Sequence, residues 1–278
     1  MSVVLALGRS DLPSNSMSCA ERRYFETSPS GGLSEVSIAR LQPRNLENPP
    51  FPVIGTVLAV SKYTLGVAAF LPHNSGRGGA RNRADRESHF LTDTQIANLR
   101  AAERFAGRIG SPFTRMITIH WEAAGVPLAG MAKATGRFTG LLAKTFARHD
   151  CETAWLWVHE NGHGKGGHCH LLVHVPATLV PRLTGLQRGW LRLITGRPYR
   201  ARVIHSDPVG GWLGLETSNP DLHAVNLESA FRYVLKGASP EVASRFALER
   251  LEPGGLIIGK RCGTSQNIGP SARKAGDC

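Results

Sequence analysis

The chain is poor in the residues that mark secreted or membrane proteins. It has five cysteines among 278 residues, and no two of them form a C-x-x-C pair. An odd and scattered set argues against a disulfide framework and against a zinc site built from thiolates. The apolar run at residues 3–7 is too short for a signal peptide, and Lys62 and two glycines interrupt the apolar segment 51–70. We therefore expect a cytoplasmic protein that makes no membrane contact.

Acidic residues are scarce relative to basic ones. The sequence contains 33 Lys and Arg against 21 Asp and Glu, for a formal net charge of +12. This balance favours a polyanionic partner such as nucleic acid. Hydrophobic residues make up 41% of the chain and charged residues 19%, which is typical of a folded globular protein and argues against a disordered one.

The sequence divides into three parts by composition. Residues 1–90 lack clear periodicity and include a basic Gly/Arg linker, so we expect a poorly ordered or accessory segment. Residues 91–262 are periodic and form the expected main domain. Residues 263–278 are expected to form a basic tail.

Hydrophobic periodicity and capping residues predict the elements of the main domain. In chain order they are a helix within 92–110, a strand at 115–121, a helix at 128–149, strands at 155–160 and 167–175, a helix from 177 to about 196, a strand at 200–204, and helices at 227–236 and 241–251. From residue 115 this order is β-α-β-β-α-β. It predicts an α+β fold of the ferredoxin-like (RRM-like) type, a mostly antiparallel sheet covered by helices.

Two histidines on one predicted strand form a candidate metal site. His168 and His170 lie two residues apart in a Leu/Val-rich run that Pro176 ends. Residues two apart on a strand share a face, so both imidazoles point to the same side. This is the simplest geometry by which a strand presents two nitrogen ligands to one ion.

A third ligand is expected from the preceding strand. Glu160 ends that strand, and the glycine-rich residues 161–167 predict a hairpin that returns the chain beside it. His159 and His163 are alternatives, because strand parity alone does not decide which residue faces the site. Imidazoles suit Zn or Mn, and a carboxylate shifts the preference towards Mn or Mg. Such an ion would act as a Lewis acid if it kept positions open for phosphate oxygens.

A tyrosine and a lysine downstream add candidate catalytic groups. In the expected helix 227–236, capped by Asn226, Tyr233 and Lys236 fall on the polar face. A phenol becomes a usable nucleophile when a neighbouring cation or metal activates it. Lys236 is suited to hold a phosphate as a point charge.

Taken in order, three segments resemble the motifs of the HUH endonuclease superfamily, in particular the rolling-circle replication initiators (Rep proteins) of plasmids and phages. They are the strand Ile117–Trp121, the triplet His168-Cys169-His170 and the run Tyr233-Val234-Leu235-Lys236. The resemblance spans about residues 110–240.

This resemblance implies a metal-dependent DNA endonuclease and strand transferase. Glu160, His168 and His170 would bind a divalent Mn or Mg ion. Tyr233 would attack single-stranded DNA at a replication origin, leaving a 5′-phosphotyrosine link and a free 3′-hydroxyl for the host replication machinery. Lys236 would position the phosphate or the tyrosine.

Alternative functions differ in what they require of the sequence. A single-tyrosine HUH transposase shares the motifs, whereas conjugative relaxases place their tyrosine before the histidine strand. A cupin-like metal hydrolase needs a glutamate soon after the second histidine, and residues 171–176 contain none. A non-catalytic ferredoxin-like nucleic-acid-binding protein needs aromatic side chains exposed on its strands. Trp155 and Trp157 are the candidates for that role.

Overall fold

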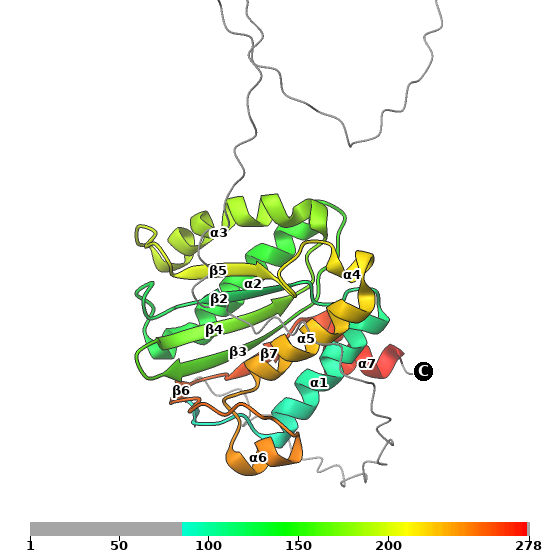
Figure 1. Cartoon of the computed structure of the whole chain (residues 1–278). Helices are drawn as coiled ribbons and strands as arrows, with labels where there is room; N and C mark the ends of the chain where they lie inside the picture. Colours follow the sequence, from blue (N-terminus) through cyan, green and yellow to red (C-terminus); the bar gives the residue numbers. More distant parts are fainter. Residues whose placement is uncertain (1–84, 277–278) are drawn as a thin grey trace, which may run out of the picture. The chain divides into compact units, whose positions relative to one another are not determined.

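The computed structural model describes residues 85–276, which form an α+β structure with helices on both faces of a sheet (Figure 1). The main sheet has five strands in the order β5-β2-β4-β3-β7, and each neighbouring pair is antiparallel. Its strands are β2 (Arg115–Ile119), β3 (Trp155–Gly162), β4 (Gly166–Val173), β5 (Ile204–Pro208) and β7 (Cys262–Thr264). Two short strands, β1 (Glu87–Ser88) and β6 (Ile257–Ile258), form a separate antiparallel pair.

Seven α-helices accompany the strands within the described part of the chain. They are α1 (Asp93–Arg108), α2 (Met131–Ala147), α3 (Val180–Thr195), α4 (Leu215–Ser218), α5 (Pro220–Val234), α6 (Pro240–Arg245) and α7 (Pro270–Gly276). Single 3₁₀ turns occur at Leu128–Gly130, Ala177–Leu179 and Gln266–Ile268. None of the helices in residues 85–276 has the length and apolar character needed to cross a membrane.

From β2 onward the order of elements is β2-α2-β3-β4-α3-β5, as the periodicity predicts. In space, β2 lies between β4 and β5, and β3 lies outside β4. This arrangement is compatible with a ferredoxin-like fold. β7 adds a fifth strand on the free edge of β3.

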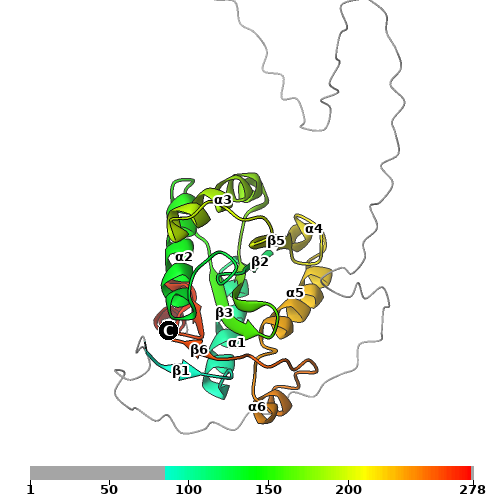
Figure 2. The ribbon, with the colours of Figure 1, turned by 90° about the vertical axis from the view of Figure 1, so that its left-hand side faces the viewer.

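Side-chain alternation along the strands gives the sheet two different faces. On one face, residues such as Met116 and Leu172 pack against α1 and α5. On the other, residues such as Ile117 and Leu171 pack against α2 and α3. Figure 2 shows α2 and α5 on opposite sides of the sheet. Trp157 packs among the buried residues of the α2–α3 side, and Trp155 packs against them.

The helix that contains Tyr233 begins seven residues earlier than expected. The Asn219 side chain accepts a hydrogen bond from the Leu222 amide at 3.1 Å and caps the helix, and Pro220 occupies the first turn. Asn226, expected to be the cap, lies inside α5 and donates to the Leu222 carbonyl at 2.8 Å. The helix also ends earlier, at Val234, so Lys236 lies beyond it.

Two further expected elements need correction. The strand expected at 200–204 lies at Ile204–Pro208 because residues 201–203 form a turn in which Arg202 has a φ of 64°. The helix expected at 241–251 stops at Arg245, shortly before Ala247, which has a φ of 49°. Both residues adopt the left-handed conformation, which regular helices and strands of L-residues exclude.

The expected domain boundaries also change. Residues 262–264 form β7 inside the main sheet, and α7 lies beside α1, where the Arg273 guanidinium donates to the Asn98 amide oxygen at 2.6 Å. The segment 263–278 is therefore part of the folded unit as far as residue 276. Within the expected segment 1–90, β1 pairs with β6. The expected linker at 74–83 lies outside the described residues.

Candidate metal centre

The register of the sheet brings Glu160, His168 and His170 together on the α1–α5 side. Glu160 is the cross-strand partner of His168 on β4. The Glu160 Oε2 atom lies 3.3 Å from Nε2 of His168 and 3.5 Å from Nε2 of His170. One ligand atom from each of the three residues falls within 4.8 Å of the others, and all three side chains are buried. The cluster could therefore bind one metal ion.

Hydrogen bonds to the other ring nitrogens orient both imidazoles. The Nδ1 atom of His168 lies 2.8 Å from the Gly166 carbonyl oxygen, which can only accept, so this nitrogen holds the hydrogen. The Nδ1 atom of His170 lies 3.0 Å from the Thr118 hydroxyl. Such secondary contacts fix the tautomer and the ring orientation of metal-binding histidines. They leave Nε2 of each ring directed at Glu160.

The polar atoms of the cluster fit a bound cation. The second carboxylate oxygen of Glu160, Oε1, is buried and has no hydrogen-bond partner. Because the hydrogen of His168 is on Nδ1, its Nε2 lone pair faces a carboxylate oxygen, a contact that needs a proton or a metal ion between the two atoms. Two imidazole nitrogens with one carboxylate are a donor set suited to Mn or Zn.

The ionisation states of Glu160 and His170 also suit metal binding. Burial alone would raise the pKa of the Glu160 carboxyl, but hydrogen bonds with His168 and His170 and the charge of Lys236 hold it well below its usual range. Burial lowers the pKa of His170 to about 4, against an opposing hydrogen bond with Glu160. At neutral pH the carboxylate is therefore ionised and His170 is neutral, the forms that bind metals.

Neither alternative third ligand lies in the cluster. His159 points to the opposite face of the sheet, where Nε2 lies 2.8 Å from the Thr135 hydroxyl and Nδ1 lies 3.0 Å from the Lys260 carbonyl. Burial lowers the pKa of His159 to about 3, so it is a neutral core residue. His163 is exposed in the turn between β3 and β4. The geometry therefore selects Glu160 among the three candidates.

Tyr233 lies against the cluster at the end of α5. Its ring centroid is 5.1 Å from that of His170, in an edge-to-face arrangement. The Lys236 ammonium and the Arg250 guanidinium lie 4.2 and 5.0 Å from the centroid of the tyrosine ring. Burial raises the pKa of Tyr233, as do the charges of Glu160 and Glu252, and Arg250 offsets this only in part. The neighbouring protein cations are therefore outweighed by burial and by the two carboxylates, and the phenol is protonated at neutral pH.

Lys236 differs most from its expected position. The sequence places it on an exposed helix face, whereas the structure buries it to 1% exposure. Its ammonium forms an ion pair with Glu160 Oε2 and lies 3.3 Å from His170 Nε2. The chain turns out of α5 at Leu235, which directs the lysine inward instead of along the helix surface. Lys236 therefore contacts the candidate metal ligands themselves.

Two further histidines extend the site along the sheet. The ring of His120 stacks on His168 with centroids 5.5 Å apart, and His205 contacts His120 at 5.8 Å. Burial, together with the neighbouring charges, lowers the pKa of His120 to about 4. His120 follows β2 two residues after Thr118, so strand parity could have identified it once β2 was paired with β4. Arg250 and Glu252, in an irregular segment, give no comparable signal.

Comparisons with protein-family models, with curated proteins and with solved structures find no match to this chain.

Proposed function

We propose that this protein is a metal-dependent DNA endonuclease and strand transferase of the HUH type that initiates rolling-circle replication. The observation that supports this most strongly is the contact between Tyr233 and a buried His-His-carboxylate cluster. A phenol beside candidate metal ligands provides both a nucleophile and a place for a phosphate that needs its charge neutralised. The antiparallel sheet and the net positive charge agree with this function.

Each residue has a defined role in the proposed reaction. A bound divalent ion, Mn or Mg, would act as a Lewis acid towards the scissile phosphate. Glu160, His168 and His170 would hold the ion, and Thr118 and the Gly166 carbonyl would keep the imidazoles oriented. Lys236, close to both Tyr233 and Glu160, would position the phosphate or the phenol.

The covalent step exchanges one phosphate ester for another. The Tyr233 hydroxyl oxygen forms a bond to phosphorus, and the bond between phosphorus and the 3′-oxygen breaks. The phenol proton is lost and the departing 3′-oxygen gains a proton. The products are a 5′-phosphotyrosine link and a free 3′-hydroxyl, which the host polymerase would extend. Burial and the nearby carboxylates raise the pKa of the Tyr233 phenol, and a cation bound at the cluster would act in the opposite direction.

The proposal predicts a covalent protein–DNA product. The protein is incubated with Mn²⁺ and single-stranded fragments that tile the DNA around its gene, and adducts are resolved on a denaturing gel. Wild type should form an adduct, whereas Tyr233→Phe and His168→Ala/His170→Ala should reduce it by at least about 100-fold. His174→Gln is the matched control and should retain activity, because the His174 ring bonds the Pro112 carbonyl at 2.8 Å, four residues beyond His170.

Other outcomes would change the assignment. An adduct that persists in Tyr233→Phe contradicts the role of this tyrosine. Fragments that are bound but never cleaved by wild type would favour a non-catalytic nucleic-acid-binding protein. Cleavage restricted to the ends of a mobile element would favour the transposase alternative, and cleavage at a transfer origin would favour a relaxase.

A further inference from the structure

The helices on the far face of the sheet form a layer without acidic residues. Residues 123–149, which include α2, contain four Lys or Arg side chains and no Asp or Glu. Residues 174–206, which include α3, contain six arginines and again no Asp or Glu. All ten cations are exposed: Lys133, Arg137, Lys144, Arg148, Arg182, Arg188, Arg192, Arg197, Arg200 and Arg202. We call this set the basic layer.

The charge of the basic layer is not compensated within the folded part of the protein. No ion pair among residues 85–276 involves any of the ten side chains. By contrast, arginines of α1 and α5 do pair with carboxylates, as Arg100 and Arg232 do with Glu228. Ten exposed positive charges repel one another, which costs electrostatic free energy. Binding of a polyanion would neutralise them and relieve this repulsion.

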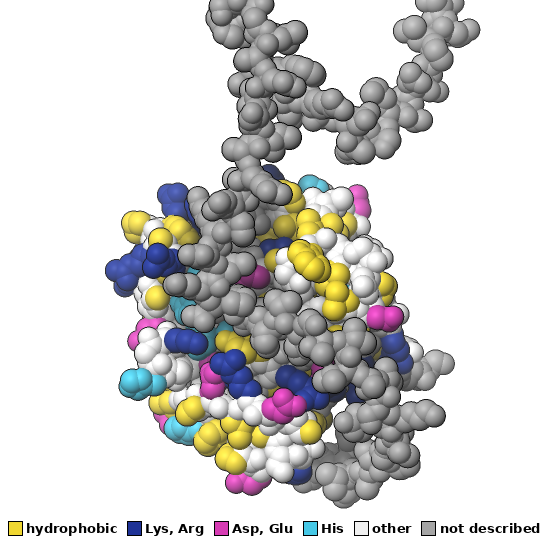
Figure 3. Space-filling view, in the orientation of Figure 1, with side chains coloured by type: hydrophobic (Ala, Val, Ile, Leu, Met, Phe, Trp, Pro, Cys, Tyr) yellow, Lys and Arg dark blue, Asp and Glu magenta, His cyan; other side chains and the backbone are white. Residues whose placement is uncertain are grey.

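The basic layer reaches the end of the sheet that holds the candidate metal centre. Its last three arginines lie in the connection between α3 and β5. In this connection, Val203 accepts a hydrogen bond from the His120 amide at 2.8 Å, and Arg200 donates to the Ala123 carbonyl at 3.2 Å. Figure 3 shows Lys and Arg side chains gathered at the upper left, over this connection. This end of the basic layer therefore lies beside His120, whose ring stacks on His168 of the candidate metal centre.

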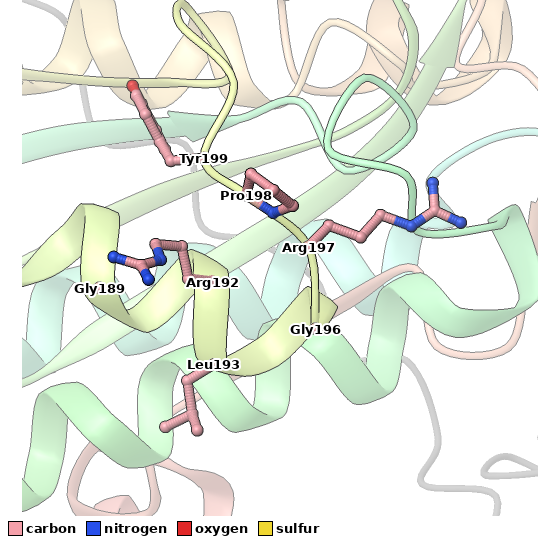
Figure 4. Close-up of a pocket in the computed structure, with 7 residues that line it drawn as sticks. All are labelled: Gly189, Arg192, Leu193, Gly196, Arg197, Pro198 and Tyr199. Atoms are coloured by element: carbon pink, nitrogen blue, oxygen red, sulfur yellow. The ribbon is translucent and has the colours of Figure 1, made fainter.

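A shallow hollow at the end of α3 belongs to the same surface. Figure 4 shows Arg192 and Tyr199 directed to one side of it, while Arg197 extends the other way. The Arg188 guanidinium lies 5.3 Å from the centroid of the Tyr199 ring. Guanidinium groups present a planar set of donors that matches phosphate oxygens.

The burial of the aromatic rings in α2 and α3 indicates that the basic layer suits double-stranded nucleic acid better than a single strand. Proteins that hold single strands stack the bases on exposed aromatic rings. Here the aromatic rings of α2 and α3 are buried (Phe138, Phe146 and Trp190) and Tyr199 is half-buried. Contacts from Arg and Lys to phosphates alone suit the outside of a double helix. Each helix is about 25 Å long, the length of about seven base pairs.

We propose that α2, α3 and the α3–β5 connection bind the phosphate backbone of double-stranded DNA. This surface holds the duplex that flanks the single strand processed at the metal centre. The placement of the duplex beside a single strand at the metal centre rests on the proposed function, whereas duplex binding by the basic layer does not.

The test measures binding of a fluorescent 20-base-pair duplex of arbitrary sequence by anisotropy in EDTA over a salt series. The variant Arg188→Ala/Arg192→Ala removes two cations one helical turn apart on α3. Loss of two phosphate contacts should lower the salt-dependence slope by about two and weaken binding roughly 60-fold at 0.1 M salt. The control Arg104→Ala/Arg108→Ala removes two exposed arginines at the same spacing on α1 and should change neither value.

Several outcomes would overturn the proposal. They are no duplex binding by wild type, equal losses in the two variant pairs, or a single strand bound more tightly than the duplex. Retained affinity in Arg188→Lys/Arg192→Lys would support it, because charge is preserved. Adduct formation on short unstructured single strands should persist in Arg188→Ala/Arg192→Ala. If wild type forms no adduct but the duplex result holds, the proposed function fails and the DNA-binding surface stands.

Discussion

Lys236 is the residue that connects the candidate ligands to the candidate nucleophile. Its ammonium is paired with Glu160, lies 3.3 Å from His170 Nε2, and lies 4.2 Å from the centroid of the Tyr233 ring. The single positive charge thus lies against the carboxylate that would also hold a divalent cation. Lys236 and a metal ion should compete for Glu160, because two cations repel strongly in a buried site.

Replacing Lys236 with methionine should therefore tighten metal binding. In DNA-free protein, Lys236→Met should bind Mn²⁺ about tenfold more tightly, or about 1.4 kcal/mol, by isothermal titration calorimetry. Without metal the variant should melt at a lower temperature, because it leaves the Glu160 carboxylate buried without its partner. Lys236→Arg keeps the charge and should resemble wild type. Weaker Mn²⁺ binding by Lys236→Met would show that the lysine assists the metal instead of competing with it.

At the scale of elements, a charged cluster fastens α5 to α1. The Arg100 guanidinium binds both carboxylate oxygens of Glu228, and Arg232 donates to the same carboxylate at 2.7 Å. The Arg100 guanidinium also lies 4.3 Å from the centroid of the Phe231 ring. Burial would raise the pKa of Glu228, but the two arginines lower it overall. The cluster fixes the helix turn that precedes Tyr233.

Glu228→Gln should lower stability in a pH-dependent way. Because the pKa of Glu228 is lower in the folded state, its contribution is present above the unfolded value of about 4.3 and disappears as the pH falls below it. Urea denaturation should show that the free energy of unfolding falls by only about 1 kcal/mol at pH 7, because the cluster is partly exposed. At pH 3.5 the decrease should be smaller, because Glu228 is then largely protonated in the unfolded state. Glu249→Gln, at a fully solvated position 3.9 Å from Arg232, should have no measurable effect. An equal loss at both pH values would contradict the electrostatic explanation.

At the scale of the whole molecule, local sequence patterns predict the order of the helices and strands well. They predict the contacts between those elements less well. The run from β2 to β5 follows from hydrophobic periodicity and from the glycine-rich hairpin, which act locally. The identity of the third candidate ligand, by contrast, depends on the pairing register between β3 and β4. Glu160 faces His168 because three residues separate the paired Gly162 and Gly166, and one more residue in the turn would put His159 on that face instead. Periodicity does not reveal turn length at that precision.

Long-range contacts explain the remaining differences. Helical spacing places Lys236 on the polar face of its helix, and lysine is rarely buried. Its pairing with the distant Glu160 accounts for its burial. β7 has three residues, too few for a periodic pattern, and it is ordered by pairing with β3. The basic, glycine-containing composition of residues 263–278 predicts a tail, because composition does not reveal this pairing.

Arg261 shows how much the C-terminal segment contributes to the fold. Its buried guanidinium donates to the Ser88 hydroxyl at 3.0 Å and to the Gly254 carbonyl at 3.3 Å, and it also binds the carbonyls of Ser88 and Gly255. The backbone on either side of Glu160 is held by the same segment. The His159 amide donates to the Arg261 carbonyl at 2.7 Å, and the Asn161 amide donates to the Gly254 carbonyl at 2.9 Å.

Arg261→Lys should therefore weaken both the fold and the metal centre. A lysine cannot reach all of these acceptors, and each buried carbonyl left unpaired is costly. The free energy of unfolding measured in urea should therefore fall by about 2–3 kcal/mol. Mn²⁺ affinity should fall as well, because the backbone around Glu160 loosens. Lys260→Ala, an exposed neighbour, serves as the control and should change neither quantity. Unchanged Mn²⁺ affinity in a destabilised Arg261→Lys would show that the two effects are independent.

The pairing of β7 with β3 also has a consequence for synthesis of the protein. A chain leaves the ribosome N-terminus first, so the histidine strand and Tyr233 emerge before residues 262–264. Until then β3 has an open edge, and the residues around Glu160 lack two of their backbone partners. We therefore expect a nascent chain that already includes Tyr233 to lack a complete candidate metal centre until residues 262–264 have been added and have paired with β3.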